Sequence, residues 1–529
     1  MQAKLAKDPT SAFTDVYDFA QAIRAGKTAF EDLDIKDVDI RLKWVGMLHR
    51  KKNPKTFMMR LKVPNGIINS EQLRFYADSV EPFGPKLGVV DITTRQNIQL
   101  RGVRLEAAPG VIDGLHALNQ TSFHSALDNV RNLVGSPLAG IADELIDTRP
   151  FCNALNDLIT VNKETGERGN PVFSNLPRKF NIAISGDDDD FSHCNINDIG
   201  LHAVEKDGVK GFNLDVGGYM SVKRVAESIP LNLWVRADIE SVNCLCEAIL
   251  RIFRDEGERK NRQKARLMWL VEKYGADEFA AEVAKEMDSY GRDICYSMER
   301  ADHVVPAEYQ RRTLLGIHAQ PQDGKSRVGV HCPEGRLSAS ECREIADLAD
   351  KYSGGEVRLT VEQNMILPNV DNDMLSALKA EPALNAPSRF AIDPGFIVGN
   401  VVSCTGAQFC GFAMITTKGL ADDISRMVAE KVIVDRPIRI HWTGCPNSCG
   451  QVQAADIGLM GGPAKKLNEE TGKMMAVPGV SIFVGGKIGP HASLSTEPRK
   501  KGVILENDIV VEEIVDIICT DFGGTRRTE

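Results

Sequence analysis

The chain has 529 residues, 43% of them hydrophobic, which is enough for several packed cores and suggests two to four domains. Its formal net charge of −9 at pH 7 argues against a nucleic-acid-binding protein, because neutralising phosphates requires a basic face. The first residues lack the apolar core of a secretory signal, and early acidic residues argue against an organelle transit peptide.

An N-terminal arm, residues 1–45, is expected to be helical. Next, residues 57–66 alternate apolar and polar positions and predict a strand that ends in a turn. Residues 70–80 have the spacing of an amphipathic helix, and residues 91–100 predict a second strand. Together these elements predict an α+β half-domain over residues 46–125.

A longer, glycine-rich α/β region follows, residues 126–320. Its part 238–290 is rich in helix formers and predicts a helical connector. Cys244 and Cys246 lie there among apolar residues at helical spacing. We therefore expect both to be small buried residues on a helix face rather than ligands.

The order of strand, turn, helix and strand recurs in residues 321–392, which predict a second half-domain. The strand and turn are predicted at 327–335, the helix at 338–352 and the second strand at 356–367. A second α/β region, residues 393–529, completes the chain.

Five short matches relate the two parts of the chain. They occur in the same order and between 258 and 271 positions apart: 64–68 with 333–337, 93–98 with 360–365, 129–130 with 400–401, 198–201 with 456–459, and 216–218 with 484–486. We infer a duplicated unit. Two halves of one duplicated fold are expected to face each other across a pseudo-dyad, with room for a large ligand between them.

The uncharged stretch 394–417 is long enough to span a bilayer. It also contains polar side chains, two cysteines and several glycines, which are unsuited to contact with lipid. We expect this stretch to be buried and to face a cofactor, and we expect no membrane-spanning segment.

Four of the twelve cysteines form two close pairs: five residues separate Cys404 from Cys410, and three separate Cys445 from Cys449. Thiolates are soft ligands that suit iron–sulfur clusters and zinc. Structural zinc sites favour shorter gaps in both pairs, whereas a five-residue gap in an uncharged stretch fits a buried cluster better. An iron–sulfur cluster is therefore predicted, and zinc or free structural cysteines are the alternatives.

In their contexts, CTGAQFCG and HWTGCPNSCGQVQAADIG, these cysteines resemble the signature of siroheme-dependent nitrite and sulfite reductases, and the resemblance covers nearly the whole chain. It implies an α+β, internally duplicated fold, with two paired ferredoxin-like half-domains and two larger α/β domains around a central cofactor cleft. It also implies a [4Fe–4S] cluster bound by Cys404, Cys410, Cys445 and Cys449, of which Cys449 is also the axial ligand of siroheme.

The resemblance places three cations of the first repeat, Arg95, Arg131 and Lys179, on the face of siroheme where substrate binds. Siroheme carries many carboxylates and its substrates are anions, so guanidinium groups suit the cleft. These cations would stabilise charge that arrives with each electron, and Lys179 would relay protons. Weaker candidates for contacts with siroheme carboxylates are Arg101, Lys264 and Arg266.

The position two residues after the active-site lysine separates the two substrates of this family: sulfite reductases typically have a second lysine there, and nitrite reductases have asparagine. This chain has Asn181. Sulfite is bulkier and partly dianionic, so one cation fewer suits nitrite, which a neutral amide can still bind. The resemblance thus predicts six-electron reduction of nitrite to ammonium, with sulfite reduction to sulfide as the alternative.

Electrons are expected to come from another protein, because the chain has no G-x-G-x-x-G turn and no apparent flavin domain. The resemblance implies reduced plant-type ferredoxin, an acidic protein that needs a basic patch near the cluster. Cations near the cluster motifs in sequence are Lys418, Arg426, Lys465 and Lys466.

A remote alternative is a non-catalytic iron–sulfur electron carrier, but such a protein would need no cationic cleft. We expect a monomer. Its expected compartment is the cytoplasm, as in a cyanobacterium, or the plastid stroma for a processed form.

Overall fold

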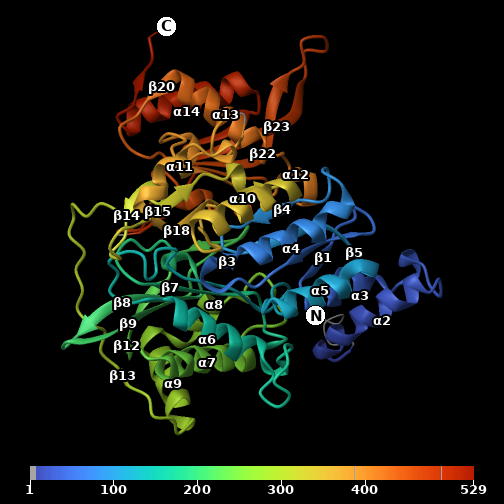
Figure 1. The fold of residues 1–529 in the computed structure, drawn as a ribbon, viewed down its shortest axis with the longest axis vertical. Coiled ribbons are helices and arrows are strands. Elements are labelled where there is room, and N and C mark those ends of the chain that lie inside the picture. Colours follow the sequence, from blue (N-terminus) through green and yellow to red (C-terminus); the bar gives the residue numbers. More distant parts are fainter. Residues whose placement is uncertain (1–6, 387, 490, 529) are drawn as a thin grey trace.

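The structure is a computed structural model that describes residues 7–386, 388–489 and 491–528 (Figure 1). The N-terminal arm contains α2 (Ala12–Arg24) and α3 (Ile35–Asp39), as expected, and the first six residues of the predicted arm lie outside the described residues. The buried Arg41 holds the arm together by binding Asp37 at 2.5 Å and Asp15 at 2.8 Å.

The two half-domains each form a five-stranded sheet, and each donates one strand to the other. The first sheet has the order β1–β2–β5–β4–β16 and the second β14–β15–β18–β17–β3. The donated strands are β3 (Ile67–Asn69), from the first repeat, and β16 (Arg336–Leu337), from the second. The other strands are β1 (Met47–His49), β2 (Thr56–Arg60), β4 (Val90–Ile92), β5 (Ile98–Arg104), β14 (Gly316–Ala319), β15 (Lys325–Val330), β17 (Glu356–Leu359) and β18 (Met365–Asp371).

The helices of the half-domains lie over these sheets. They are α4 (Ser70–Val80) and α5 (Ala108–Ala117) in the first, and α10 (Ala339–Tyr352) and the short α11 (Leu375–Lys379) in the second. α4 and α10 pack on each other, and the two half-domains share one hydrophobic core (Figure 1). This pairing is the pseudo-dyad arrangement expected from the repeat.

One sequence prediction for the half-domains is wrong. Residues 91–100 and 356–367 do not form single strands, because each folds into a hairpin: β4 and β5 in the first repeat, β17 and β18 in the second. The polar runs between the strands turn through Gln96 (φ 51°) and Gln363 (φ 64°), a left-handed conformation that a strand does not contain. Arg95 therefore lies in a tight turn.

The two larger domains contain matching sheets. The first has the order β13–β12–β9–β8–β7–β6 and the second β19–β21–β22–β23–β24. Their strands are β6 (Val130–Val134), β7 (Phe180–Ser185), β8 (Ile199–Lys206), β9 (Val209–Val216), β12 (Ile229–Arg236), β13 (Tyr296–Ser297), β19 (Val401–Ser403), β21 (Ile440–Thr443), β22 (Ile457–Leu467), β23 (Met474–Val484) and β24 (Lys500–Ile504). Ile182 lies opposite Ile199, and Ile440 lies opposite Ile457 at the same repeat offset.

Helices cover these two sheets. They are α6 (Arg149–Thr160), α7 (Ile239–Glu256), α8 (Leu267–Tyr274) and α9 (Ala276–Ser289) in the first domain, and α12 (Gly406–Phe409), α13 (Leu420–Lys431) and α14 (Asn507–Asp521) in the second. The predicted connector, residues 238–290, is largely helical, and Cys244 and Cys246 are buried residues of α7, as expected. Two small ribbons join β10 (Tyr219–Met220) to β11 (Val225–Ala226) and β20 (Val432–Ile433) to β25 (Thr525–Arg526).

Strained backbone positions recur in both repeats. Left-handed φ angles occur at four pairs of non-glycine residues, at the repeat offsets: Asn65 and Glu334, Gln96 and Gln363, Asp190 and Ser448, His193 and Gln451. Such angles cost energy for residues with a Cβ atom, so their pairwise recurrence is strong support for a duplicated fold.

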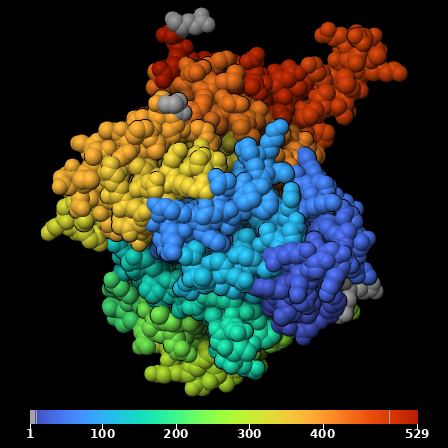
Figure 2. All heavy atoms as spheres, turned by 45° about the vertical axis from the view of Figure 1, so that its right-hand side comes forward, coloured from blue at the N-terminus to red at the C-terminus, as the bar shows by residue number. Residues whose placement is uncertain are grey.

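Figure 2 shows the first half-domain in blue lying directly against the second in yellow, and the hairpin of β22 and β23 projecting from the C-terminal end. Among the residues that the structure describes, every helix is too short or too polar to cross a bilayer. We propose that the domains have the boundaries predicted above, except that β14 pairs with β15 and so belongs to the second half-domain, and that β3 and β16 are exchanged between the half-domains.

Candidate active site

The four paired cysteines follow two neighbouring strands. Cys404 follows β19 and Cys445 follows β21, and these strands are parallel, so both loops leave the same edge of the sheet. Cys404 Sγ accepts backbone N–H groups from Gly406 at 3.4 Å and from Gly444 at 3.1 Å. Donors of this kind stabilise a thiolate and tune a bound cluster.

The cysteines also influence one another electrostatically. Burial raises the pKa of Cys445, and the nearby Cys410 and Cys404 raise it further. Burial, followed by Cys404, likewise raises the pKa of Cys449. Within the described residues, no group of three or more His, Cys, Asp or Glu side chains could hold a single metal ion. A four-iron cluster requires a different arrangement of ligands. Each thiolate binds its own iron, so the four sulfurs lie farther apart than around a single metal ion.

Cys449 differs from the other three cysteines because its side chain is exposed to solvent. Protein nevertheless surrounds it closely, and the cations Lys179 and Arg95 act to lower the pKa of its thiol. A ligand bound to this sulfur would therefore lie near those cations.

Arg95 is held beside Cys449 by its own turn. Asn132 donates from Nδ2 to the carbonyl of Arg95 at 2.8 Å and to that of Val63 at 2.6 Å, which fixes the turn against β6. Thr94 donates from Oγ1 to the carbonyl of Cys449 at 3.1 Å, which joins the turn to the cysteine loop. Burial lowers the pKa of Arg95.

Arg131 lies on β6 and is fixed by the backbone of the preceding loop. It donates to the carbonyls of Ser125 and Leu127, both at 2.7 Å, and its buried Nε has no hydrogen-bond partner in the described part of the chain. Burial, together with the neighbouring Arg95, lowers its pKa to about 9. The loop carbonyls thus orient a cation that still has a donor available.

Lys179 and Asn181 stand at the start of β7. Burial lowers the pKa of Lys179 well below its ordinary value, and Arg266 and Arg95 act in the same direction. The backbone N–H of Asn181 donates to Asp198 Oδ2 at 2.8 Å, and its buried side-chain Oδ1 has no partner among the described residues. Asn181 thus presents an unpaired amide oxygen, an acceptor, at the start of β7.

The uncompensated charge in this region supports an anionic ligand. In the part of the chain that the structure describes, neither Arg95 nor Lys179 forms an ion pair with a carboxylate. Arg60, at the end of β2, joins them: burial and then Arg131 and Arg95 lower its pKa, and its Nε has no partner within the described residues. Partly buried cations without acids are unfavourable unless a ligand supplies the charge, and the carboxylates of siroheme fit this set.

Arg60 is a residue that the sequence analysis missed. It lies in a strand predicted from its alternation, and an arginine in such a strand is usually on the solvated face. The only signal was its position within the stretch 57–66 that begins the repeat.

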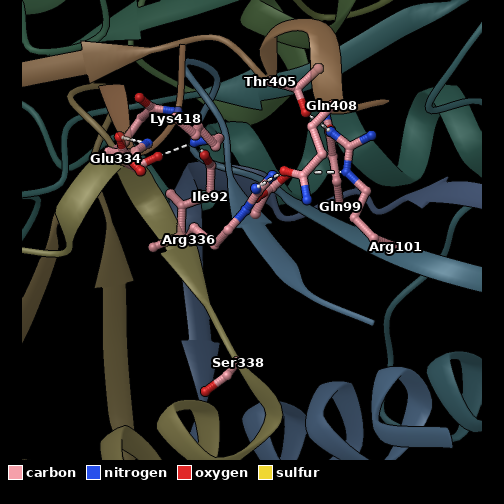
Figure 3. A network of polar contacts seen from close by, with 12 residues as sticks. Ile92, Gln99, Arg101, Glu334, Arg336, Ser338, Thr405, Gln408 and Lys418 are labelled. Atoms are coloured by element: carbon pink, nitrogen blue, oxygen red, sulfur yellow. Dashed lines mark hydrogen bonds and ion pairs between the residues drawn. The ribbon is translucent and has the colours of Figure 1, made fainter. Parts of the chain in front are cut away.

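The weaker sequence candidates lie in different surroundings. Arg266 is buried and pairs with Asp198 at 2.5 Å, and Lys264 is exposed and lies over the ring of Trp269. Arg101 donates to Asp91, Gln99 and Thr405, next to the cysteine loop (Figure 3). Protein groups thus occupy Arg101 and Arg266, and their contacts with siroheme stay predictions.

Two protein families match the chain, and each of them matches two separate ranges. The family described as "Nitrite and sulphite reductase 4Fe-4S domain" matches residues 126–289 and 397–528. The family "Nitrite/Sulfite reductase ferredoxin-like half domain" matches residues 49–118 and 318–385. Each family matches twice, once in each repeat, which confirms the predicted duplicated fold.

Relatives cover almost the full chain. The "Ferredoxin--nitrite reductase, chloroplastic" of Zea mays is 45% identical over 99% of this chain and 90% of its own, and the "Ferredoxin--nitrite reductase" of Synechococcus elongatus is 44% identical over 99% and 96%. The solved structure of the Mycobacterium tuberculosis NirA protein superposes with a TM-score of 0.81 at 26% identity, over 97% of this chain and 91% of that one. The chain belongs to the nitrite and sulphite reductase family.

Proposed function

We propose that this chain is a ferredoxin–nitrite reductase, which reduces nitrite to ammonium with six electrons at a siroheme joined to a [4Fe–4S] cluster. One observation carries the site: the accessible sulfur of Cys449 lies beside Arg95 and Lys179, which have no acidic partner within the described residues. Relatives with this name at 44–45% identity support the substrate.

Cys404, Cys410, Cys445 and Cys449 would hold the cluster, and Cys449 would also bind the siroheme iron. Arg60 would pair with a siroheme carboxylate. Arg101, Lys264 and Arg266 are weaker candidates for the same role. When bound, the two groups supply single electrons to the substrate. The protein keeps the cations in place for them, since the turn of Arg95 is tied to the loop of Cys449.

Arg95, Arg131 and Lys179 would hold the anion and stabilise the negative charge that each electron adds. Lys179 suits proton delivery, because a lysine whose pKa is lowered by burial gives up its proton more readily than an exposed one. Loss of each oxygen of nitrite requires its protonation to water, so a donor beside the anion serves the reaction directly.

Asn181 supports nitrite over sulfite. Its amide is neutral and can donate to an anion, and its backbone is fixed by Asp198, so the side chain starts from a defined position. A lysine there would add a charge that a dianion uses better than a monoanion.

A face beside the cysteine loop suits ferredoxin. Phe412, two residues after Cys410, is 66% exposed, and the guanidinium of Arg50 lies over its ring at 5.8 Å. Two contacts place this part of the first half-domain against the cysteine loop: Lys52 bonds the carbonyl of Ala407, and the carbonyl of Lys86 accepts from Gln408 Nε2 at 3.4 Å. Lys51 and Lys86 are exposed there. We call this set of Arg50, Lys51, Lys52, Lys86 and Phe412 the docking face.

Three of the four cations suggested from sequence alone are already engaged by protein groups. Lys418 is only partly exposed and bonds the carbonyl of Glu334, Arg426 pairs with Asp422 at 2.9 Å, and Lys466 pairs with Glu506 at 2.6 Å. The fourth, Lys465, is exposed and stays a candidate. We further propose a monomer that works in the cytoplasm of a cyanobacterium-like cell or in a plastid stroma, where ferredoxin is available.

Turnover of nitrite and of sulfite, each with reduced ferredoxin and with methyl viologen, tests the proposal. We expect nitrite to be the better substrate with both donors and the purified protein to contain about five irons per chain, four from the cluster and one from siroheme. Faster sulfite turnover would establish the sulfite reductase alternative. Cluster absorption without turnover of either anion would indicate an electron carrier.

A further inference from the structure

The buried Asp91 binds Arg101 of the first repeat and Arg336 of the second. Figure 3 shows both arginines reaching the cysteine loop at Thr405 and Gln408. Arg336, on the donated strand β16, is the strand partner of Asp91 on β4. It binds Asp91 through two bonds, Nε to Oδ1 at 2.7 Å and Nη2 to Oδ2 at 3.0 Å. Arg101 binds the same carboxylate at 2.9 Å. One acid therefore orients two arginines from different repeats.

Both arginines then reach the segment 405–409, which lies between the cluster ligands Cys404 and Cys410. The remaining Nη1 of Arg336 donates to Gln408 Oε1 at 2.6 Å, and Arg101 Nη2 donates to Thr405 Oγ1 at 2.8 Å. The ring of Phe409 is within reach of both cations, at 4.8 Å from Arg101 and 5.2 Å from Arg336. The segment is thus held at Thr405, which precedes α12, and at Gln408 and Phe409, which lie at its end.

The charges of this group do not cancel. Two guanidinium groups share one carboxylate, so the group has an excess of positive charge, and Arg101 acts electrostatically on Cys410. Positive charge and hydrogen bonds near an iron–sulfur cluster favour its reduced state and raise its reduction potential. A rigid segment also keeps the cluster in one orientation for electron transfer.

We propose that Arg336 is a positioning residue for the [4Fe–4S] cluster: it crosses from the second repeat to hold segment 405–409 through Gln408 and, with Arg101, places positive charge beside Cys410. The inference rests on the cluster of the proposed function. The strand exchange would then contribute to electron transfer, because β16 is the strand that carries Arg336 to the cysteine loop.

The test uses the full-length holoenzyme and the midpoint potential of its cluster, measured by a redox titration followed by electron paramagnetic resonance. Arg336→Gln should shift the potential to a more negative value. Arg336→Lys keeps the charge but cannot make all three bonds, so it should shift the potential less. The matched control is Arg343→Gln, which breaks an equivalent link from α10 to Asp78 and Glu81 without touching the cysteine loop. The control should leave the potential unchanged.

An unchanged potential in Arg336→Gln, or an equal shift in Arg343→Gln, would overturn the proposal. If Arg336→Gln does not fold, the double variant Thr405→Val with Gln408→Leu decides, because it removes both bonds to the segment and leaves Asp91 and its arginines intact. It should lower the iron content or broaden the cluster signal, and a wild-type result in both would also overturn the proposal. The potential is read without nitrite or ferredoxin, so it stays interpretable even if the wild-type enzyme proves not to reduce nitrite.

Discussion

Asn181 and Asp198 show how a backbone contact can leave a side chain free for a ligand. Asp198 accepts the N–H of Asn181 and is itself held by Arg266, so the start of β7 has a fixed position. The equivalent acid in the second repeat, Asp456, accepts the N–H of Arg439 in the same way. Both repeats therefore fix this strand with an aspartate, and they differ in the side chain that the fixed residue carries: asparagine at 181 and arginine at 439.

Asn181→Lys should raise the ratio of sulfite to nitrite turnover. The added cation can pair with the extra charge of sulfite, and its longer side chain enters a place suited to a smaller anion. One charged contact is worth about 1–3 kcal/mol, so we expect a change of roughly tenfold to a hundredfold. Turnover with methyl viologen measures the ratio. The cofactor spectrum is the control, and an unchanged ratio with a normal spectrum would place the selectivity elsewhere.

Lys62 provides a pH-dependent contribution to stability. It is 1% exposed, donates to the carbonyl of Arg131 at 2.8 Å, and burial lowers its pKa to about 7. Between about pH 7 and 10.5 the unfolded chain therefore binds more protons than the folded chain, so Lys62 makes stability rise with pH in that window.

Lys62→Met removes this slope. From pH 7 to pH 9 the free energy of unfolding of the wild type should increase relative to the variant, by up to about 2 kcal/mol. Urea unfolding at the two pH values measures the difference, and the same offset at both would contradict the assignment.

Residues with a recognisable motif were predictable, and others were not. The four cysteines, Arg95 and Lys179 stand in local signatures, and the structure brings Arg95 and Lys179 to Cys449. Arg60 and Arg336 have no such signature, since an arginine in a strand is usually solvated. We propose their roles from an Nε that lacks a partner among the described residues in one case and from a shared carboxylate in the other.

At the scale of elements, the repeat was predictable and its strand exchange was not. Matches such as 64–68 with 333–337 show that two units exist, but β3 and β16 are only three and two residues long. A strand this short has no periodicity that could assign it to either sheet. The hairpins at 91–100 and 356–367 were missed because their turns use left-handed Gln96 and Gln363 rather than glycine.

The exchange predicts that neither half folds alone. Fragment 1–304 would lack β16 and fragment 305–529 would lack β3, which leaves an open sheet edge and an uncovered core in each. The cut follows Val304, which is 87% exposed and lies outside any helix or strand. The separate fragments should aggregate, and co-expressed fragments should purify together. A folded, monomeric 1–304 fragment, judged by circular dichroism and sedimentation, would show that the exchange is not required.

At the scale of the whole molecule, the net charge of −9 would repel an acidic electron donor, so docking requires a local cluster of cations. The docking face does so locally, since it gathers cations around the exposed ring of Phe412 beside the cysteine loop. The sequence did not reveal this face because its cations come from residues 50–52 and 86, more than three hundred positions before the cysteines. Only the packing of the first half-domain on α12 brings them there.

Charge reversal tests the docking face. Lys51→Glu combined with Lys86→Glu should raise the KM for ferredoxin about tenfold, because two exposed charge contacts of up to about 1 kcal/mol each are lost. Activity with methyl viologen should stay near the wild-type value, since that small donor needs no docking. The matched control is Lys285→Glu on α9, at the opposite end of the molecule from α12 (Figure 1), and it should change neither activity.

Salt gives a second measurement of the same contact. Exposed charges are screened over about 10 Å at 0.1 M salt, so the ferredoxin-linked rate of the wild type should fall as ionic strength rises. The double variant should lose most of this dependence, because the charges that produce it are gone. If the variant and the wild type showed equal salt dependence, ferredoxin would have to bind elsewhere. If salt affected the methyl viologen rate just as strongly, the effect would belong to the cleft of Arg95 and Lys179 and not to docking.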